Sequence, residues 1–293
     1  MSCRRKASGC GRTTTVIPDM KRRIGMALGG GGARGLAHIP LLEVLDEMGL
    51  RPSIMAGTSM GAIVAALYAS GVSARGMREM VEEFFATRGT PLDRLRNTDW
   101  RKALALMDIN FGRGGLIKGE KILSFFSGRL GNKRFSDLDI PLFLVATDFW
   151  RCEETVLQDG DLAQAVRASM AVPGVFAPVE QDGRVLVDGG LVNPLPYELV
   201  MPYCDISVAV DVSSSGRTGK RQYVPGVPET ISLSFDTMQK ALTSQKMKFA
   251  RPDVYLAPQM PGIGLLDFHK AKEAFAAGDA LKDGFRREME NRL

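Results

Sequence analysis

Two short apolar runs, each followed by a turn and a helical repeat, constrain the fold of this chain most strongly. Residues 24–28 are continuously apolar and end in the four glycines 29–32, and Leu36 to Met48 then repeats apolar residues at helical spacing. A second run, Ser53–Ala56, leads through a turn into a small-residue helix over Ala62–Ala69. This alternation predicts βαβ units around a parallel sheet.

The rest of the chain continues the same pattern less regularly. Strands are predicted over Pro141–Thr147, Thr155–Gln158, Arg184–Val187 and Ile206–Val212, and helices over Glu229–Phe249 and Lys270–Asn291. Residues 86–117 form an irregular insertion. Residues 213–228 are rich in Ser, Gly, Lys and Arg, and we interpret them as a long surface loop, mobile rather than a lid.

The net charge of +5 is concentrated at the N-terminus. Residues 1–23 hold seven of the 38 basic side chains and one of the 33 acidic ones, so the remaining 270 residues carry a net charge of −1. A basic face for nucleic acid is therefore disfavoured. We expect residues 1–22 to form a disordered arm and residues 23–293 to form a single domain, and we expect a chain that begins at Met20 to fold and act as the whole chain does.

Cysteine spacing and hydropathy indicate a cytoplasmic protein. Cys3, Cys10, Cys152 and Cys204 lie far apart without a C-x-x-C pair, which supports neither a zinc site nor a disulfide framework. The uncharged stretch from Pro52 to Arg75 is interrupted by glycine, serine and threonine. A strand, a turn and a helix explain this stretch better than a membrane span does.

The second turn carries a candidate nucleophile. Gly57-Thr58-Ser59-Met60-Gly61 fits the pattern G-x-S-x-G between a predicted strand and a predicted helix. Small residues at both ends, Gly57 and Gly61, allow a turn sharp enough to expose the Ser59 hydroxyl beside a helix N-terminus. The alternative is a tight strand–helix crossing that needs glycines only for packing.

Three residues are candidates for the base that activates Ser59. His38 lies inside the first helix, where a packed role is expected, and His269 lies near the C-terminus, where a Ser-Asp-His order is formally possible. Asp188 ends a short apolar strand and is followed by Gly189 and Gly190, which leave room for a close approach of backbone or substrate. A carboxylate would need a dry pocket to be basic enough. An ordinary hairpin turn at Asp-Gly-Gly is the alternative.

The glycine loop Gly29–Gly35 follows the first strand and precedes the first helix. Its backbone N–H groups, at a helix N-terminus, can bind a phosphate or stabilise an oxyanion. The loop also fits G-x-G-x-x-G, but that dinucleotide-binding pattern needs an acidic residue at the end of the next strand. Ala56-Gly57-Thr58-Ser59 stands there instead, so the sequence favours an oxyanion hole.

These three elements in this order resemble the patatin-like phospholipase family, whose signatures are a G-G-G-x-R-G loop, a G-x-S-x-G elbow and a D-G-G motif. Residues 160–179 look like the segment that leads into the family's aspartate. Asp267-Phe268-His269 and the terminal helix resemble the compact bacterial members related to the neuropathy target esterase catalytic domain. The resemblance covers about residues 22–212.

The resemblance implies a three-layer α/β/α sandwich and hydrolysis of lipid acyl esters through an acyl-serine intermediate, without a metal or cofactor. Ser59 would be the nucleophile, Asp188 the base of a dyad, and the N–H groups of Gly30, Gly31 and Gly32 the oxyanion hole. Arg34 fills the motif's basic position, where it would either anchor the loop or attract an anionic head group. The expected partners are a lipid or acyl-ester substrate and a transient membrane surface, but no nucleic acid. The alternatives are a non-catalytic regulatory protein on the same fold and a Ser-His-Asp hydrolase that uses His269.

Overall fold

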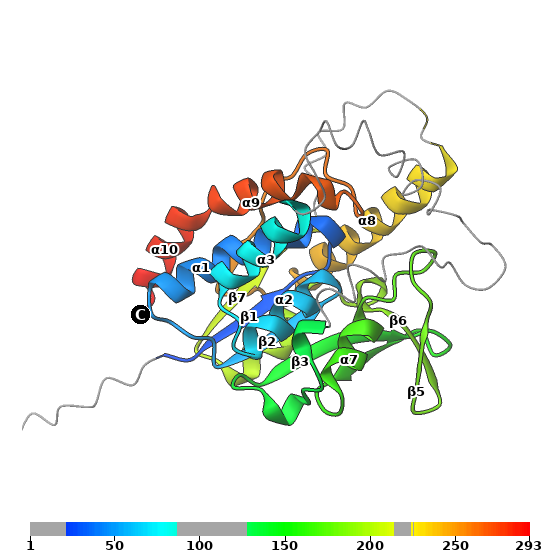
Figure 1. Ribbon diagram of the computed structural model, residues 1–293, viewed down its shortest axis with the longest axis horizontal. Helices are drawn as coiled ribbons and strands as arrows, with labels where there is room; N and C mark the ends of the chain where they lie inside the picture. Colours follow the sequence, from blue (N-terminus) through cyan, green and yellow to red (C-terminus); the bar gives the residue numbers. More distant parts are fainter. Residues whose placement is uncertain (1–21, 87–127, 214–223, 225) are drawn as a thin grey trace, which may run out of the picture.

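The protein is built on one eight-stranded sheet (Figure 1). The computed structural model describes residues 22–86, 128–213, 224 and 226–293. The strand order is β5-β6-β3-β2-β1-β7-β8, and β4 pairs with β3. The strands are β1 Ile24–Leu28, β2 Ile54–Thr58, β3 Leu142–Asp148, β4 Glu153–Leu157, β5 Val179–Gln181, β6 Arg184–Asp188, β7 Ile206–Val210 and β8 Val254–Leu256.

The centre of the sheet is parallel. β1 lies between β2 and β7, and the pairs β2–β3 and β7–β8 are parallel as well. Every residue of β1, β2 and β7 is buried, because both faces of these strands are covered. The strands β4, β5 and β6 form the antiparallel part of the sheet, where β4 and β6 both pair with β3. The predicted α/β fold with a mostly parallel sheet is therefore confirmed.

Helices flank the sheet in two unequal layers. The α-helices are α1 His38–Glu47, α2 Met60–Ala69, α3 Ala74–Ala86, α7 Leu162–Ser169, α8 Val227–Lys246, α9 Ala271–Asp279 and α10 Lys282–Glu290. All of them except α8 share one apolar core with Met26 and Leu28 of β1. The opposite face carries small residues such as Ala27 and Ala209, and it is covered by η4 Tyr197–Leu199, η5 Met201–Tyr203 and the end of α8.

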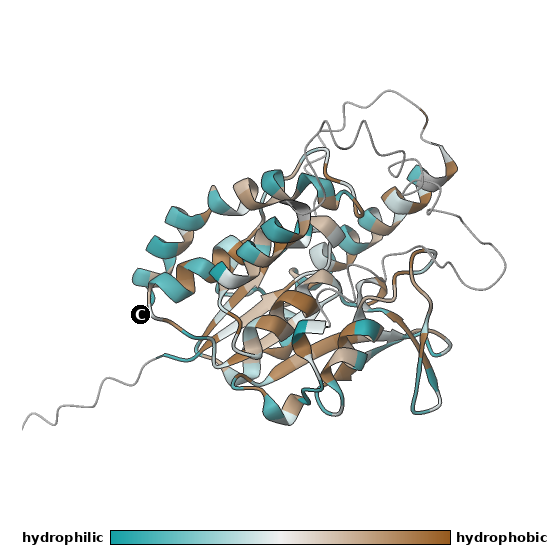
Figure 2. Ribbon diagram, in the orientation of Figure 1, coloured by the Kyte–Doolittle hydropathy of each residue, from teal (hydrophilic) through white to brown (hydrophobic). Residues whose placement is uncertain are grey.

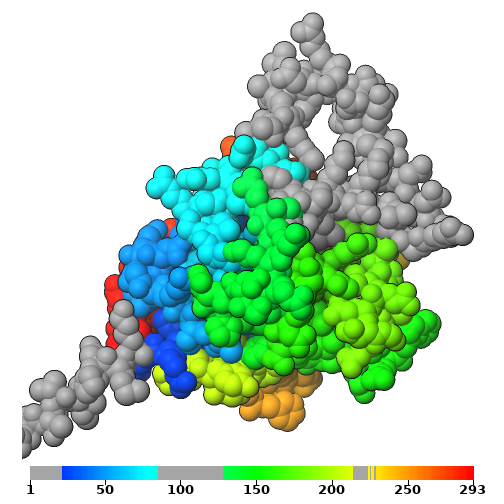
Figure 3. Space-filling model, turned by 60° about the horizontal axis from the view of Figure 1, so that its bottom comes forward, coloured from blue at the N-terminus to red at the C-terminus, as the bar shows by residue number. Residues whose placement is uncertain are grey.

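The exposed and buried parts of these layers differ clearly in hydropathy. Figure 2 shows the hydrophobic colour concentrated in the central sheet and on α2, and the hydrophilic colour on α10. All ten residues of α2 are buried, as expected of a helix that is apolar on every side. Figure 3 shows that the green segment, which holds β3, β4 and α7, makes up much of one face of the molecule. No helix in the described ranges is long and apolar enough to cross a membrane.

Several element boundaries differ from the sequence prediction. β2 continues past Ala56 to Thr58, directly before Ser59. The first predicted helix begins as the 3-10 turn η1 Gly32–Ala37. The predicted helix over 270–291 is divided into α9 and α10, although Ala280 and Leu281 keep right-handed helical angles. Gly278 and Gly284 lie on either side of this junction but within α9 and α10, and the predicted helix runs through both of them.

Some expectations fall on residues outside the described ranges. They include most of the expected arm over 1–22, nearly all of the insertion over 86–117, and most of the predicted loop over 213–228, whose last residues already belong to α8. The sequence reading did not anticipate α3 or α7. Three further 3-10 turns are η2 Phe135–Asp137, η3 Gly189–Leu191 and η6 Phe268–Lys270.

Candidate active site

β2 and β6 meet end to end along one edge of β3. Thr58 of β2 pairs in parallel with Val145, and Asp188 of β6 pairs in antiparallel with the next residue, Ala146. β4 pairs with this whole part of β3, so it occupies the other edge. The carboxyl ends of β2 and β6 therefore face each other, which brings together Ser59 and Asp188, 129 positions apart in the sequence.

Ser59 stands in a strained turn between β2 and α2. Its backbone has φ 55° and ψ −122°, an unusual conformation for a residue with a side chain. A Cβ on Gly61 would lie 2.1 Å from the carbonyl oxygen of Leu28, and one on Gly57 would lie 2.6 Å from that of Gly61. Both glycines are thus needed for the turn to pack. The N-terminus of α2 lies directly behind Ser59, as predicted.

Asp188 is completely buried at the end of β6. Its Oδ1 accepts a hydrogen bond from Gly190 N–H at 2.7 Å. Its Oδ2 accepts no hydrogen bond of standard geometry from the described residues. Burial raises the pKa of Asp188 to about 6, although the nearby Ser59 hydroxyl and the Gly190 N–H both lower it. The carboxylate is therefore more basic than usual and has one oxygen available to take a proton.

The two glycines after Asp188 are required by close packing. A Cβ on Gly189 would lie 2.3 Å from the carbonyl oxygen of Val145, and one on Gly190 would lie 2.9 Å from Asp188 Oδ1. The chain continues from Asp188 into the 3-10 turn η3 rather than into a second strand. The interpretation of Asp-Gly-Gly as a hairpin turn is therefore wrong.

One of the three glycine N–H groups expected in the oxyanion hole is already hydrogen-bonded to the protein. Gly30 N–H donates to the carbonyl oxygen of Pro194 at 2.9 Å, so the expectation that it serves the oxyanion hole is wrong. Gly30 instead allows close packing, since a Cβ there would lie 3.3 Å from Ser59 Cβ. The N–H groups of Gly31 and Gly32 donate to no acceptor among the described residues. Gly32 has φ 56°, and a Cβ on it would lie 2.1 Å from the carbonyl oxygen of Leu265.

Arg34 anchors this loop from inside the protein. Its side chain is fully buried and forms a bidentate ion pair with Asp236 of α8, at 2.7 and 3.2 Å. Its Nε also donates to the carbonyl oxygen of Gly31 at 3.3 Å. Of the two roles considered for Arg34, the geometry supports the anchor, because no part of the side chain reaches the surface to meet a head group.

The sequence profile of the family described as "Patatin-like phospholipase" matches residues 26–201, a range that includes the glycine loop, Ser59 and Asp188. The chain belongs to the patatin-like phospholipase family. The predicted resemblance to this family is confirmed.

Curated relatives of this patatin-like chain include bacterial and mammalian proteins. An uncharacterized NTE family protein of Mycobacterium tuberculosis is 36% identical over 206 residues, which cover 70% of this chain and 53% of the relative. Patatin-like phospholipase domain-containing protein 6 of Mus musculus is 31% identical over 203 residues, which cover 68% of this chain and 14% of that protein. The chain thus spans about half of the mycobacterial relative's length and a small part of the mouse protein's.

Solved structures with a similar arrangement are distant in sequence. VipD from Legionella pneumophila has a TM-score of 0.46 at 15% identity, covering 91% of this chain and 67% of that one. The type III effector protein ExoU has a TM-score of 0.42 at 14% identity, covering 92% of this chain and 53% of that one.

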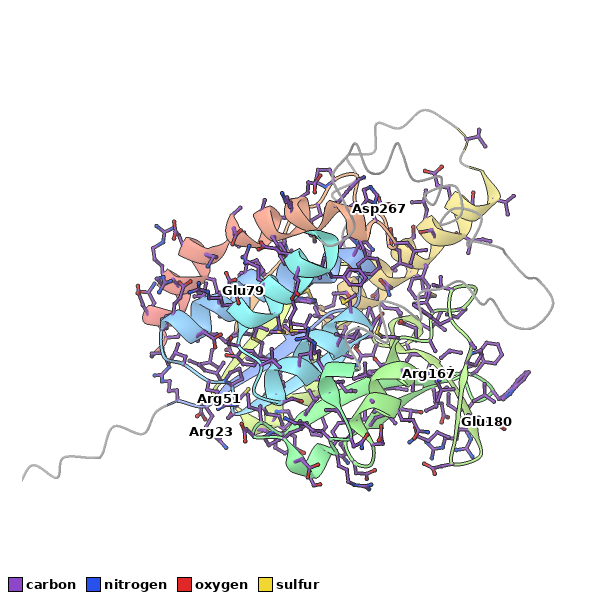
Figure 4. All side chains as sticks on the ribbon, viewed as in Figure 1. Arg23, Arg51, Glu79, Arg167, Glu180 and Asp267 are labelled. Carbon is purple, nitrogen blue, oxygen red and sulfur yellow. The ribbon has the colours of Figure 1, made fainter. Side chains whose placement is uncertain are left out.

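Among the described residues, neither histidine is hydrogen-bonded to Ser59 or Asp188. His38 is fully buried at the start of α1, where its Nε2 lies 2.8 Å from the carbonyl oxygen of Gly29, and burial lowers its pKa to about 4. His269 is exposed in η6, beside Asp267, which Figure 4 labels. Within the described ranges, no cluster of His, Cys, Asp or Glu could hold a metal ion.

Sequence reasoning missed a segment that joins three parts of the site. The carbonyl oxygen of Asn193 accepts a hydrogen bond from Thr58 Oγ1 at 2.9 Å, and that of Leu195 accepts one from Lys246 Nζ at 2.7 Å. Pro194 between them accepts the Gly30 N–H. Three successive carbonyl groups therefore fix the elbow, the glycine loop and the end of α8 relative to one another. The only available signal was the position of this segment shortly after Gly190.

Proposed function

We propose that this chain hydrolyses acyl-ester bonds of lipids through a Ser59–Asp188 dyad and an acyl-serine intermediate. The free Oδ2 of the buried Asp188, at the junction where β2 and β6 meet, is the observation that carries the proposal. A general base works best when its pKa lies near the working pH. Burial moves Asp188 toward that range without the help of a histidine.

The first half of the reaction forms the acyl-enzyme. Ser59 Oγ attacks the ester carbonyl carbon while its proton passes to Asp188 Oδ2. The N–H groups of Gly31 and Gly32 and the N-terminal dipole of α2 stabilise the oxyanion. The tetrahedral intermediate then expels the alcohol, which takes the proton from Asp188 and leaves the acyl group on Ser59.

The second half releases the fatty acid. A water molecule gives a proton to Asp188 and attacks the acyl-serine carbonyl, and the oxyanion again lies at Gly31 and Gly32. As the intermediate collapses, the proton returns from Asp188 to Ser59 Oγ and the acid leaves. The dyad ends in its starting state, so each cycle consumes only the ester and water.

We further propose that the protein contacts a lipid surface through the turn between β3 and β4. β3 runs past the Ser59–Asp188 junction at Ala146, and four residues later Trp150 stands 76% exposed in the turn to β4. Phe149 beside it is 45% exposed, and the two rings form an edge contact at 5.1 Å. Exposed aromatic side chains favour the boundary between water and lipid. An encounter of this kind would be peripheral to the membrane and transient.

Two variants of the dyad test the reaction. Ser59→Ala and Asp188→Asn should each abolish hydrolysis of short-chain acyl esters and lysophospholipids, while circular dichroism shows a folded protein. His269→Ala is the matched control and should keep full activity. If His269→Ala is inactive and Asp188→Asn active, the enzyme uses a Ser-His-Asp triad. A protein that neither hydrolyses esters nor reacts with a fluorophosphonate at Ser59 would instead be a non-catalytic regulatory protein.

A further inference from the structure

The last residue of α7 and the residues directly after it contact the backbone of both proposed dyad residues. Ser59 N–H donates to Ser169 Oγ at 2.9 Å. Two residues further along, the carbonyl oxygen of Ala171 accepts a hydrogen bond from Asp188 N–H at 3.0 Å. One short stretch of chain therefore holds the nucleophile and the base at the same time.

The position of Ser169 is otherwise typical of a core residue. It is the last residue of α7 and is fully buried, and the buried residues of this helix before it are apolar: Leu162, Ala165, Val166 and Ala168. Figure 4 labels Arg167, which lies on the exposed side of the same helix. A hydroxyl at such a buried position is unfavourable unless it is hydrogen-bonded, and its partner here is the amide of Ser59.

The amide that Ser169 binds belongs to the strained turn. With φ at 55°, Ser59 keeps its conformation only because the residues around it determine it. The peptide between Thr58 and Ser59 is fixed by Ser169 on its N–H, while the Thr58 side chain is bonded to Asn193. Rotation of this peptide would change the φ angle of Ser59 and would therefore move the Ser59 Oγ relative to Asp188.

We propose that Ser169 is a positioning residue, whose hydroxyl oxygen aims the Ser59 nucleophile at Asp188. This inference rests on the proposed function, since it assigns a role within the same dyad. Ser169 takes no part in proton transfer and touches no substrate. Its effect is on the rate at which Ser59 attacks, because a small misplacement of reacting atoms slows a reaction more than it weakens substrate binding.

Two substitutions of Ser169 separate the hydroxyl from the volume of the side chain. Ser169→Ala removes the acceptor with little change in size, and we expect kcat on a soluble short-chain ester to fall about 10- to 100-fold with KM changed less than about twofold. Ser169→Thr keeps the hydroxyl and should remain within about threefold of the wild-type kcat. Ser207→Ala is the matched control: Ser207 is also a buried, hydrogen-bonded serine, but it binds Asp253 between β7 and β8.

Reaction with a fluorophosphonate distinguishes positioning from a purely structural role. The proposal predicts that Ser169→Ala is labelled completely but slowly, with a second-order rate constant reduced by the same factor as kcat/KM. A structural role would give a smaller labelled fraction at the wild-type rate constant. Ser207→Ala should lower the melting temperature and leave kcat unchanged.

Several results would overturn the role of Ser169. They are a wild-type kcat in Ser169→Ala, an equal loss in Ser169→Thr and Ser169→Ala, and a reduced labelled fraction without a slower rate. If Ser169→Ala does not fold, Ser169→Cys replaces it, because sulfur is a weaker acceptor; a wild-type kcat in that variant then refutes the inference. Activity that survives Ser59→Ala would refute the proposed function itself. Failure of the proposed function can therefore be distinguished from failure of the role of Ser169.

Discussion

Arg34 Nε donates to the carbonyl oxygen of Gly31, while the rest of the same guanidinium binds Asp236. A trans peptide is planar, so fixing the Gly31 carbonyl directs the Gly32 N–H to the opposite side. The ion pair between the glycine loop and α8 therefore also sets the orientation of a proposed oxyanion donor.

Substitution of Arg34 by Lys tests this relationship. A lysine keeps the charge opposite Asp236 but lacks the planar fork that binds Asp236 and Gly31 together. We expect Arg34→Lys to lower kcat about 10- to 100-fold, less than the roughly 100- to 1,000-fold effect of removing an oxyanion donor outright, with a smaller change in KM. Steady-state kinetics on a soluble ester measure this effect. Lys282→Arg, in the ion pairs with Glu43 and Glu47, should keep full activity.

The pH dependence of activity should report Asp188. The base must be ionised to accept the serine proton, and burial raises its pKa to about 6. We expect kcat/KM to rise with pH and to reach half its maximum near pH 6. If this rise of activity with pH disappears in His269→Ala, the titrating group is the histidine. If the rise is centred near pH 4, Asp188 has an ordinary pKa.

Asp188→Asn should make the inactive protein more stable at neutral pH. The folded state raises the pKa of Asp188 from 3.8 to about 6, so it holds the proton more tightly than the unfolded chain does. Above pH 6 the wild type therefore carries a buried charge that opposes folding, by up to about 3 kcal/mol. This cost fades as the pH falls from 6 to 4.

Chemical denaturation of the two proteins at several pH values measures that difference. The advantage of Asp188→Asn should be largest at pH 7 and small near pH 4. A variant that is less stable than the wild type at pH 7 would mean that the Asp188 carboxylate is stabilised by its surroundings.

Trp150→Ala tests the proposed contact with lipid. The side chain is largely exposed, so its removal should leave folding and the hydrolysis of a soluble ester unchanged. We expect binding to phosphatidylcholine–phosphatidylglycerol vesicles, measured by co-sedimentation, to weaken severalfold, together with hydrolysis of lipid in those vesicles. Phe249→Ala, a substitution of another exposed aromatic residue, is the control and should bind as the wild type does. Equal vesicle binding by all three proteins would rule out the Trp150 contact.

The residues within each local motif could be predicted from the sequence, and the links between motifs could not. Gly57, Ser59 and Gly61 belong to one turn whose geometry depends on its own residue types. By contrast, Gly30 N–H is occupied by Pro194, and Ser59 N–H binds Ser169, because distant segments pack there. Local spacing contains no information about such partners, so the sequence did not show that the Gly30 N–H is already hydrogen-bonded.

The shared edge of β3 also makes the dyad sensitive to strand register. Side chains alternate between the two faces of a sheet, so shifting β6 by one residue along β3 would turn Asp188 to the opposite face. An insertion in the β5–β6 loop leaves the pairing of Ala146 with Asp188 in place, whereas one extra residue between Val145 and Ala146 would separate Ser59 from Asp188 by roughly 3.3 Å. The spacing of residues along β3 thus sets the distance between Ser59 and Asp188. Descendants of this sequence can therefore vary in the loops around the sheet far more freely than in the length of β3.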